Sequence, residues 1–193
     1  MKQQNEFYIS VDVETNGPCP GIHSMLQFGA VFFDYYGNEF DFAIFNLHEI
    51  EGGVADEDTM NWWMDQEKRN PGSWSSMREF CVTPTYAMQS FTDQVLKHKN
   101  KTKASPVVVG YPSGFDFTWL YWYLHKYTGD SCVGFSALDM KSFAMARLGL
   151  DFRASTKRSF PKSWFSKDLP HTHNALDDAR EQGHMFLKMA GIK

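Results

Sequence analysis

The chain has 193 residues, of which 42% are hydrophobic, 16% aromatic and 22% charged, and its formal net charge is −4. This length and apolar content exclude a disordered or low-complexity chain and suit one domain better than two, so we expect a single domain over residues 1–193. The acidic balance argues against attachment to nucleic acid through bulk positive charge, although it does not exclude a local basic patch.

The cysteines and the hydropathy indicate where the protein works. Cys19, Cys81 and Cys132 lie far apart and form no CxxC pair, which favours a reducing cytoplasm over a disulfide framework. No stretch approaches the roughly 20 apolar residues that cross a bilayer, and the N-terminus has no apolar signal core. We therefore expect a soluble cytoplasmic protein with no membrane contact.

The first part of the chain predicts three antiparallel strands. Residues 7–14 alternate strictly between two faces, and 25–33 form a nearly continuous apolar run, as in a strand covered on both faces. A turn centred on YYGN leads into a third strand at 39–47. These segments predict a three-stranded meander.

The rest of the chain alternates helices with short strands. The patterns predict helices over 56–69, 84–99, 115–127, 138–148 and 174–190, and strands over 107–109 and 132–136. Residues 151–170 are expected to form an irregular loop, and the lysines at 97–103 are typical of a solvated helix end. This order predicts one α/β domain with a mixed sheet.

Two acidic residues share one face of the first strand. Asp12 and Glu14 stand at positions i and i+2, so both carboxylates project from the same side. Two neighbouring acids on a central strand are costly unless a cation pairs with them, and a divalent metal is the usual partner. A solvated face is the alternative interpretation, and for this pair taken alone it is the better one.

The final helix carries another acid on its predicted core-facing stripe. Asp178 shares this stripe with Ala175, Ala179, Gln182, Phe186 and Met189. The residues expected on the opposite, solvated face are Asp177, Glu181, His184 and Lys188. A carboxylate aimed inward needs a partner, and we favour a metal over a salt bridge or a contact with the helix dipole.

One more acid and two histidines are candidates. Asp116 begins an aromatic helix after a buried strand, where a helix cap and a metal ligand are both open interpretations. His173 precedes Asp178 by five residues, so it belongs in the loop before the helix, where a neutral imidazole can accept a proton from water at a metal. His171 competes for this role, and a plain loop histidine is the alternative for both.

These five residues resemble a known catalytic set. The order and context of Asp12, Glu14, Asp116, His173 and Asp178 are similar to those of the DEDDh (DnaQ-like) 3′–5′ exonucleases, which have a ribonuclease H-like fold. YISVDVETNG resembles their first motif, GFDFTWL the second and HNALDDA the third, and the resemblance spans residues 7–187. The WW of TMNWWMDQ is similar to a segment of the exonuclease VIII-like and related exoribonuclease branch.

The resemblance implies a fold and a mechanism. It implies a mixed five-stranded sheet flanked by helices, with the meander and parallel strands in one sheet. It also implies two Mg²⁺ or Mn²⁺ ions about 4 Å apart, held by Asp12, Glu14, Asp116 and Asp178, with His173 as the general base. The implied reaction hydrolyses single-stranded RNA or DNA from its 3′ end and releases nucleoside 5′-monophosphates. A homodimer is implied by family analogy and by the aromatic content.

Several residues are candidates for substrate contact. Residues 151–170 mix basic and aromatic side chains, which suits phosphate contact and base stacking, although a solvated loop pinned by its aromatics is an equal alternative. The candidates are Thr15, Phe115, Arg153, Lys157, Arg158 and Trp164. The chain departs from many relatives in the GYPSG loop before Asp116, and at Gln27, where many have Glu.

Two other classes of function compete with this interpretation. A non-catalytic nucleic-acid-binding domain on the same fold is the alternative, and the intact set of four acids and one histidine speaks against it. A serine hydrolase using Ser113 is excluded, because Gly110 precedes this serine by three residues and a G-x-S-x-G elbow needs two.

Overall fold

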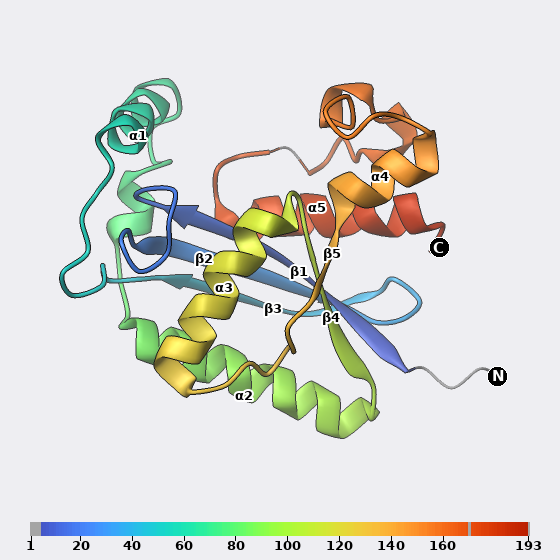
Figure 1. Ribbon diagram of the computed structural model, residues 1–193, viewed down its shortest axis with the longest axis horizontal. Coiled ribbons are helices and arrows are strands. Elements are labelled where there is room, and N and C mark those ends of the chain that lie inside the picture. The colour runs from blue at the N-terminus through green and yellow to red at the C-terminus, as the bar shows by residue number, and fades with distance from the viewer. Residues whose placement is uncertain (1–4, 170, 193) are drawn as a thin grey trace.

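The computed structural model describes residues 5–169 and 171–192, which form a five-stranded mixed sheet with helices on both faces (Figure 1). The strand order is β3-β2-β1-β4-β5. The strands are β1 (Glu6–Thr15), β2 (Met25–Phe33), β3 (Glu39–Asn46), β4 (Ser105–Gly110) and β5 (Ala137–Asp139). The α-helices are α1 (Glu57–Arg69), α2 (Pro84–Thr102), α3 (Ser113–Thr128), α4 (Met140–Leu148) and α5 (Ala175–Ala190). This architecture confirms the predicted ribonuclease H-like α/β fold.

Strand β1 lies in the centre of the sheet. It pairs antiparallel with β2, where Asp12 lies opposite Gly29 and Glu14 opposite Gln27, and parallel with β4 on its other side. Strand β2 in turn pairs antiparallel with β3, so the predicted meander is confirmed. The two acidic residues of β1 therefore project from the middle of the sheet.

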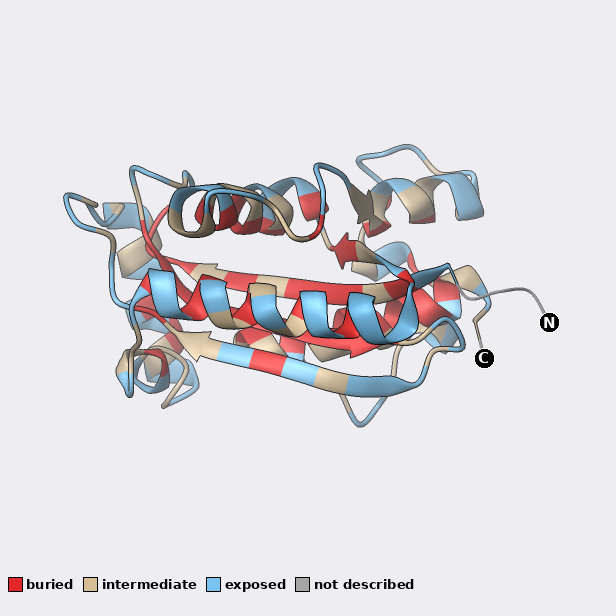
Figure 2. Ribbon diagram, turned by 90° about the horizontal axis from the view of Figure 1, so that it is seen from below, coloured by how far each residue is buried: buried red, intermediate tan, exposed pale blue. Residues whose placement is uncertain are grey.

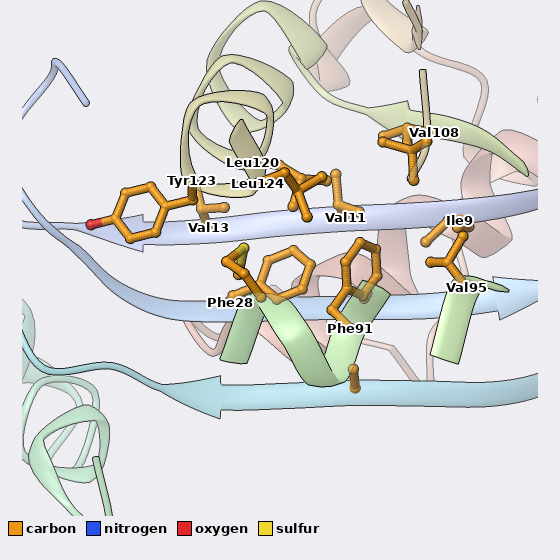
Figure 3. Close-up of a cluster of buried hydrophobic side chains, with 14 of the residues drawn as sticks. Ile9, Val11, Val13, Phe28, Phe91, Val95, Val108, Leu120, Tyr123 and Leu124 are labelled. Carbon is orange, nitrogen blue, oxygen red and sulfur yellow. The ribbon is translucent and has the colours of Figure 1, made fainter. Parts of the chain in front are cut away.

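One face of the sheet packs against α2 and α3. The side chains of Ile9, Val11 and Val13 point to this side, where Figure 3 shows them beside Phe91 of α2 and Leu120 of α3. All of these side chains are buried, and Figure 2 shows the burial concentrated in the sheet and on the inward sides of the helices. Because side chains alternate along a strand, this apolar face leaves Asp12 and Glu14 on the opposite face.

Helix α5 covers that opposite face at very short range. A Cβ atom at Gly29 would lie 2.2 Å from the backbone of Ala175, so only glycine lets the start of the helix approach β2. Asn174 caps the helix, since its Oδ1 accepts hydrogen bonds from the N–H groups of Leu176 and Asp177. Gln27 accepts a further bond from the Ala175 N–H at 2.7 Å. The beginning of α5 is thereby fixed over the acidic part of the sheet.

The region between α3 and α4 differs from the prediction. The predicted strand at 132–136 is wrong, because residues 131–134 form a turn in which Ser131 Oγ donates to the Gly134 carbonyl, and β5 begins at Ala137. Helix α4 begins at Met140 rather than at 138, since Asp139 ends the strand and caps the helix by accepting from the Ser142 N–H. No helix among the described residues is both long and apolar enough to span a membrane.

Candidate active site

Three of the predicted acids converge where β1 meets α5. Each of Asp12, Glu14 and Asp178 offers a carboxylate oxygen, and these oxygens all lie within 4.8 Å of one another. Asp178 is fully buried, whereas the two acids of β1 are partly exposed. The alternation of β1 and the inward stripe of α5 thus bring the three side chains together, as the sequence patterns predicted.

Asp116 belongs to the same acidic group but comes from the other side of the sheet. It lies in the first turn of α3, is 4% exposed, and raises the pKa of Asp12 through its charge. The interpretation of Asp116 as a helix cap is wrong, because Pro112 holds the N-cap position and Asp139 Oδ1 accepts from the Ser113 N–H. Its Oδ2 is buried and finds no hydrogen-bond partner among the residues that the structure describes. A buried carboxylate oxygen without a partner is suited to a cation.

Burial and neighbouring negative charges make ionisation of Asp12 and Glu14 unfavourable in the absence of a cation. Burial is the main cause that raises the pKa of Asp12 well above its usual value, followed by the charges of the neighbouring acids, and the Gln182 amide opposes the shift by donating to Asp12 Oδ1 at 2.6 Å. Burial and the charge of Asp178 likewise raise the pKa of Glu14. Burial raises the pKa of Asp116 to about 7. Divalent ions that prefer hard oxygen ligands, such as Mg²⁺ and Mn²⁺, fit this donor set.

Both candidate histidines lie beside Asp178, in the loop before α5. The backbone N–H of His173 donates to Asp178 Oδ2 at 3.0 Å, and its ring packs edge-on against Trp62 at 5.0 Å. His171 is closer to the carboxylate through its ring, with Nδ1 3.0 Å from Asp178 Oδ2. Burial and the neighbouring His171 lower the pKa of His173, while Asp178 opposes the shift. The predicted position of His173 in the loop is confirmed, and its role as the base stays a prediction.

A half-buried ion pair lies at the site and was not predicted from the sequence. Glu181 was expected on the solvated face of α5, and this prediction is wrong, because the residue is 7% exposed and its Oε2 lies 2.5 Å from Lys157 Nζ. Residues 151–169 fold back over α5, and the periodicity of the helix carries no signal of that contact. The ammonium group of Lys157 also lowers the pKa of Asp116, so this predicted substrate contact does lie beside the acids.

The other predicted substrate contacts lie in different surroundings. Thr15 is buried, with Oγ1 donating to the Gly17 carbonyl at 2.8 Å and its own carbonyl accepting from Trp63 Nε1 at 2.9 Å. Phe115 is 36% exposed at the start of α3, and Arg153 and Arg158 are exposed. Trp164 packs against Phe160, with the ring centres 5.4 Å apart. Their contact with substrate stays a prediction.

The difference at Gln27 has a structural explanation. Its amide oxygen accepts from the Ala175 N–H, and its amide nitrogen donates to Asn46 Oδ1 at 2.8 Å. Gln27 therefore connects β2 to both α5 and β3. A side chain that donates and accepts at the same time suits this buried position better than a carboxylate, which only accepts.

Comparisons with known proteins agree with the fold and show a family. The family described as "3'-5' exoribonuclease Rv2179c-like domain" matches residues 7–189. The 3'-5' DNA exonuclease Cap18 of Escherichia coli is 30% identical over 186 residues, which cover 96% of this chain and 92% of that protein.

Solved structures share the fold at low sequence identity. A full-length 3'-exonuclease has a TM-score of 0.71 at 10% identity, over 97% of this chain and 83% of its own. Exonuclease I has a TM-score of 0.66 at 14% identity, over 96% of this chain and 41% of its own. The family model and the Cap18 relative define the class of protein as a 3′–5′ exonuclease. The chain belongs to the family of the 3'-5' exoribonuclease Rv2179c-like domain.

Proposed function

We propose that the protein uses divalent metal ions to hydrolyse the terminal phosphodiester bond at the 3′ end of single-stranded nucleic acid, releasing nucleoside 5′-monophosphates. The observation that carries this proposal is the convergence of Asp12, Glu14 and Asp178 with the unpartnered Asp116 oxygen. Structures of exonuclease I with single-stranded oligonucleotides support the choice of a single strand. The family description refers to RNA and the Cap18 relative to DNA, so the experiment below includes both.

The acids have distinct positions around the metal site. Asp12 and Glu14 of β1, Asp116 of α3 and Asp178 of α5 would hold the ions. When bound, two Mg²⁺ or Mn²⁺ ions supply Lewis-acid activation of water and stabilise charge on the leaving oxygen. Gln182 and the N–H groups of Thr172 and His173 hold the carboxylates of Asp12 and Asp178 in place through hydrogen bonds of 2.6–3.0 Å.

His173 is the residue that we assign as the general base. Its lowered pKa keeps the imidazole neutral at pH values where an ordinary histidine is partly charged, and the neutral ring is the form that accepts a proton from water. His171 is already engaged, because its Nδ1 contacts Asp178 Oδ2. Trp62 packs edge-on against the His173 ring and restricts its orientation. The ring is therefore available and held next to the acids.

The substrate is held by groups around the acids. Lys157 brings a positive charge next to Asp116 and Glu181, where a phosphate of the substrate would approach. The exposed ring of Phe115 and the exposed guanidinium groups of Arg153 and Arg158 provide stacking and phosphate contacts.

The homodimer and the cytoplasmic location stay predictions.

The experiment compares two neighbouring acids of α5. Asp178→Asn is expected to abolish shortening of labelled RNA and DNA oligonucleotides with Mg²⁺ or Mn²⁺. Asp177→Asn is the matched control, because Asp177 is exposed and should be dispensable. Wild-type rates for Asp178→Asn, or activity that survives EDTA, would refute the metal mechanism. Oligonucleotide binding without any hydrolysis by the wild-type protein would favour the non-catalytic alternative.

A further inference from the structure

An aromatic groove lies along the outer side of α3. Phe117, Tyr121 and His125 follow one another at intervals of four residues, and their ring centres are 5.6 Å and 4.4 Å apart. Together with Trp122 they form one wall of a groove of about 590 Å³. The described residues that line it are Pro20, Phe117, Thr118, Tyr121, Trp122, His125 and Lys126. We call this feature the α3 groove.

The core accounts for these rings only in part, because Phe117 and Trp122 pack against it whereas Tyr121 is not among the described residues that do so. The inward side of α3 already buries Trp119, Leu120 and Tyr123 completely. The outward side of a surface helix normally carries polar residues, yet Phe117, Tyr121 and Trp122 are only half-buried there. Exposed apolar patches of this kind mark surfaces that bind other molecules.

The α3 groove begins at the two elements that carry the acids. Phe117 follows Asp116 directly, and Pro20 belongs to the loop that leaves β1 after Glu14. From Phe117 to Lys126 the helix rises about 14 Å, which is room for a few nucleotides. Figure 1 shows α3 running from the level of α5 down towards α2. A strand whose 3′ end lies among the acids can therefore continue along this helix.

The chemistry of the groove suits a nucleic-acid strand. Half-buried aromatic rings offer flat surfaces for bases, and base stacking on such rings is tolerant of sequence. Lys126 and His125 are exposed, and Lys126 provides positive charge for phosphates. No acidic side chain occurs among the described residues that line the groove. Glu49 and Glu51 line the adjoining pocket, which shares Trp122 and Lys126, so carboxylates lie beside the groove and not within it.

We propose that the α3 groove binds the part of a single-stranded substrate that lies 5′ of the terminal nucleotides, with bases stacked near Tyr121 and Trp122 and phosphates near Lys126. This inference rests on the proposed function, since it places the 3′ end at the four acids. It assigns to α3 a role in binding longer strands rather than in the hydrolysis itself. Affinity should therefore rise with strand length until the groove is filled.

The test measures binding and hydrolysis as a function of length. The substrates are the p-nitrophenyl ester of thymidine 5′-monophosphate, which has no upstream strand, and a single strand of about twelve nucleotides. Tyr121→Ala should raise the KM and the Kd for the long strand by about tenfold, the effect of losing one stacked base, and leave kcat/KM for the ester unchanged. Tyr121→Phe keeps the ring and should behave as wild type. Tyr36→Ala removes a half-exposed tyrosine from the turn between β2 and β3 and serves as the control.

The outcomes separate this inference from the proposed function. If Tyr121→Ala lowers kcat/KM equally for the ester and the long strand, or for neither, the proposal that the groove binds the upstream strand is overturned. Sedimentation that shows Tyr121→Ala separating a dimer into monomers would overturn it as well, because the groove would then be an interface between two copies. Fluorescence anisotropy in EDTA measures binding of the long strand without hydrolysis. If Tyr121→Ala weakens this binding and the wild-type protein cleaves neither substrate, the groove binds the strand but the proposed function is wrong.

Discussion

Replacement of Asp116 by asparagine should make the metal-free protein more stable at alkaline pH. Asp116 is 4% exposed, and burial raises its pKa from 3.8 to about 7. The unfolded chain therefore releases this proton at lower pH than the folded chain, so stability is lost as the pH rises from about 4 to about 7. At 1.36 kcal/mol per pKa unit, the shift corresponds to a penalty of about 4 kcal/mol once the group is ionised. Asp116→Asn removes the ionisation and with it this penalty.

The assay is thermal and urea unfolding of both proteins in EDTA, at about pH 5 and about pH 8. At the higher pH we expect the variant to be more stable by about 2 to 4 kcal/mol, or about 5 to 15 °C in Tm for a chain of this size. At the lower pH the advantage of the variant should shrink to about 1 to 2 kcal/mol, because most of the penalty builds up between about pH 5 and about pH 7. Addition of Mg²⁺ or Mn²⁺ should stabilise the wild type more than the variant, because the ions bind the folded acids.

The result that refutes this reasoning is a variant that is no more stable than wild type in EDTA at about pH 8. Burial of the ionised Asp116 carboxylate would then carry no penalty, and the case for a cation beside it would lose its electrostatic support. Asp177→Asn is the control, because it removes an exposed acid from the first turn of α5, next to Asp178, and should change neither the pH dependence nor the response to metal.

Three further predictions concern single residues around the site. His173→Ala should lose most of its turnover and the acidic limb of its pH–kcat profile while keeping the metal-induced rise in Tm; an unchanged profile would exclude His173 as the base. Lys157→Met should lower both stability, by about 1 to 3 kcal/mol, and turnover, since it leaves Glu181 buried without its cation. The double variant Lys157→Met with Glu181→Gln should regain stability, measured by urea unfolding, but not turnover, measured in nuclease assays. Recovery of both would argue against a contact between Lys157 and the substrate. Gly29→Ala should destabilise the fold by about 3 kcal/mol or more, because its Cβ would overlap α5. Gly114→Ala has free space and a helical position, and should be neutral or slightly stabilising in the same unfolding assay.

The orientation of three of the four acids could be predicted, because it depends on the periodicity of a single strand or helix. Asp12 and Glu14 share a strand face, and Asp178 falls on the inward stripe of a helix, so local patterns sufficed to orient all three. The strong alternation of β1 and the apolar run of β2 likewise predicted that these strands lie in the middle of the sheet. Asp116 was harder, because its role depends on where α3 begins relative to β5.

The remaining features depend on contacts between distant parts of the chain. Glu181 is buried only because residues 151–169 fold back and place Lys157 against it, and a helical pattern carries no information about a loop that covers it. The last strand was predicted at 132–136, whereas β5 spans Ala137–Asp139. Asp139 accepts hydrogen bonds from the N–H groups of Ser113 at the start of α3 and Ser142 in α4, and no local signal shows this double role. Gln27 similarly connects three elements.

The central claim is that the four acids and their metal ions remove nucleotides one at a time from a 3′ end. The most direct measurement follows single strands that carry a 5′ label, with a free or a blocked 3′ hydroxyl, and identifies the small products by mass. The account predicts a ladder of fragments shortened from the 3′ end, nucleoside 5′-monophosphates as products, and no reaction in EDTA. Internal cleavage, nucleoside 3′-monophosphates or a reaction that proceeds in EDTA would contradict it.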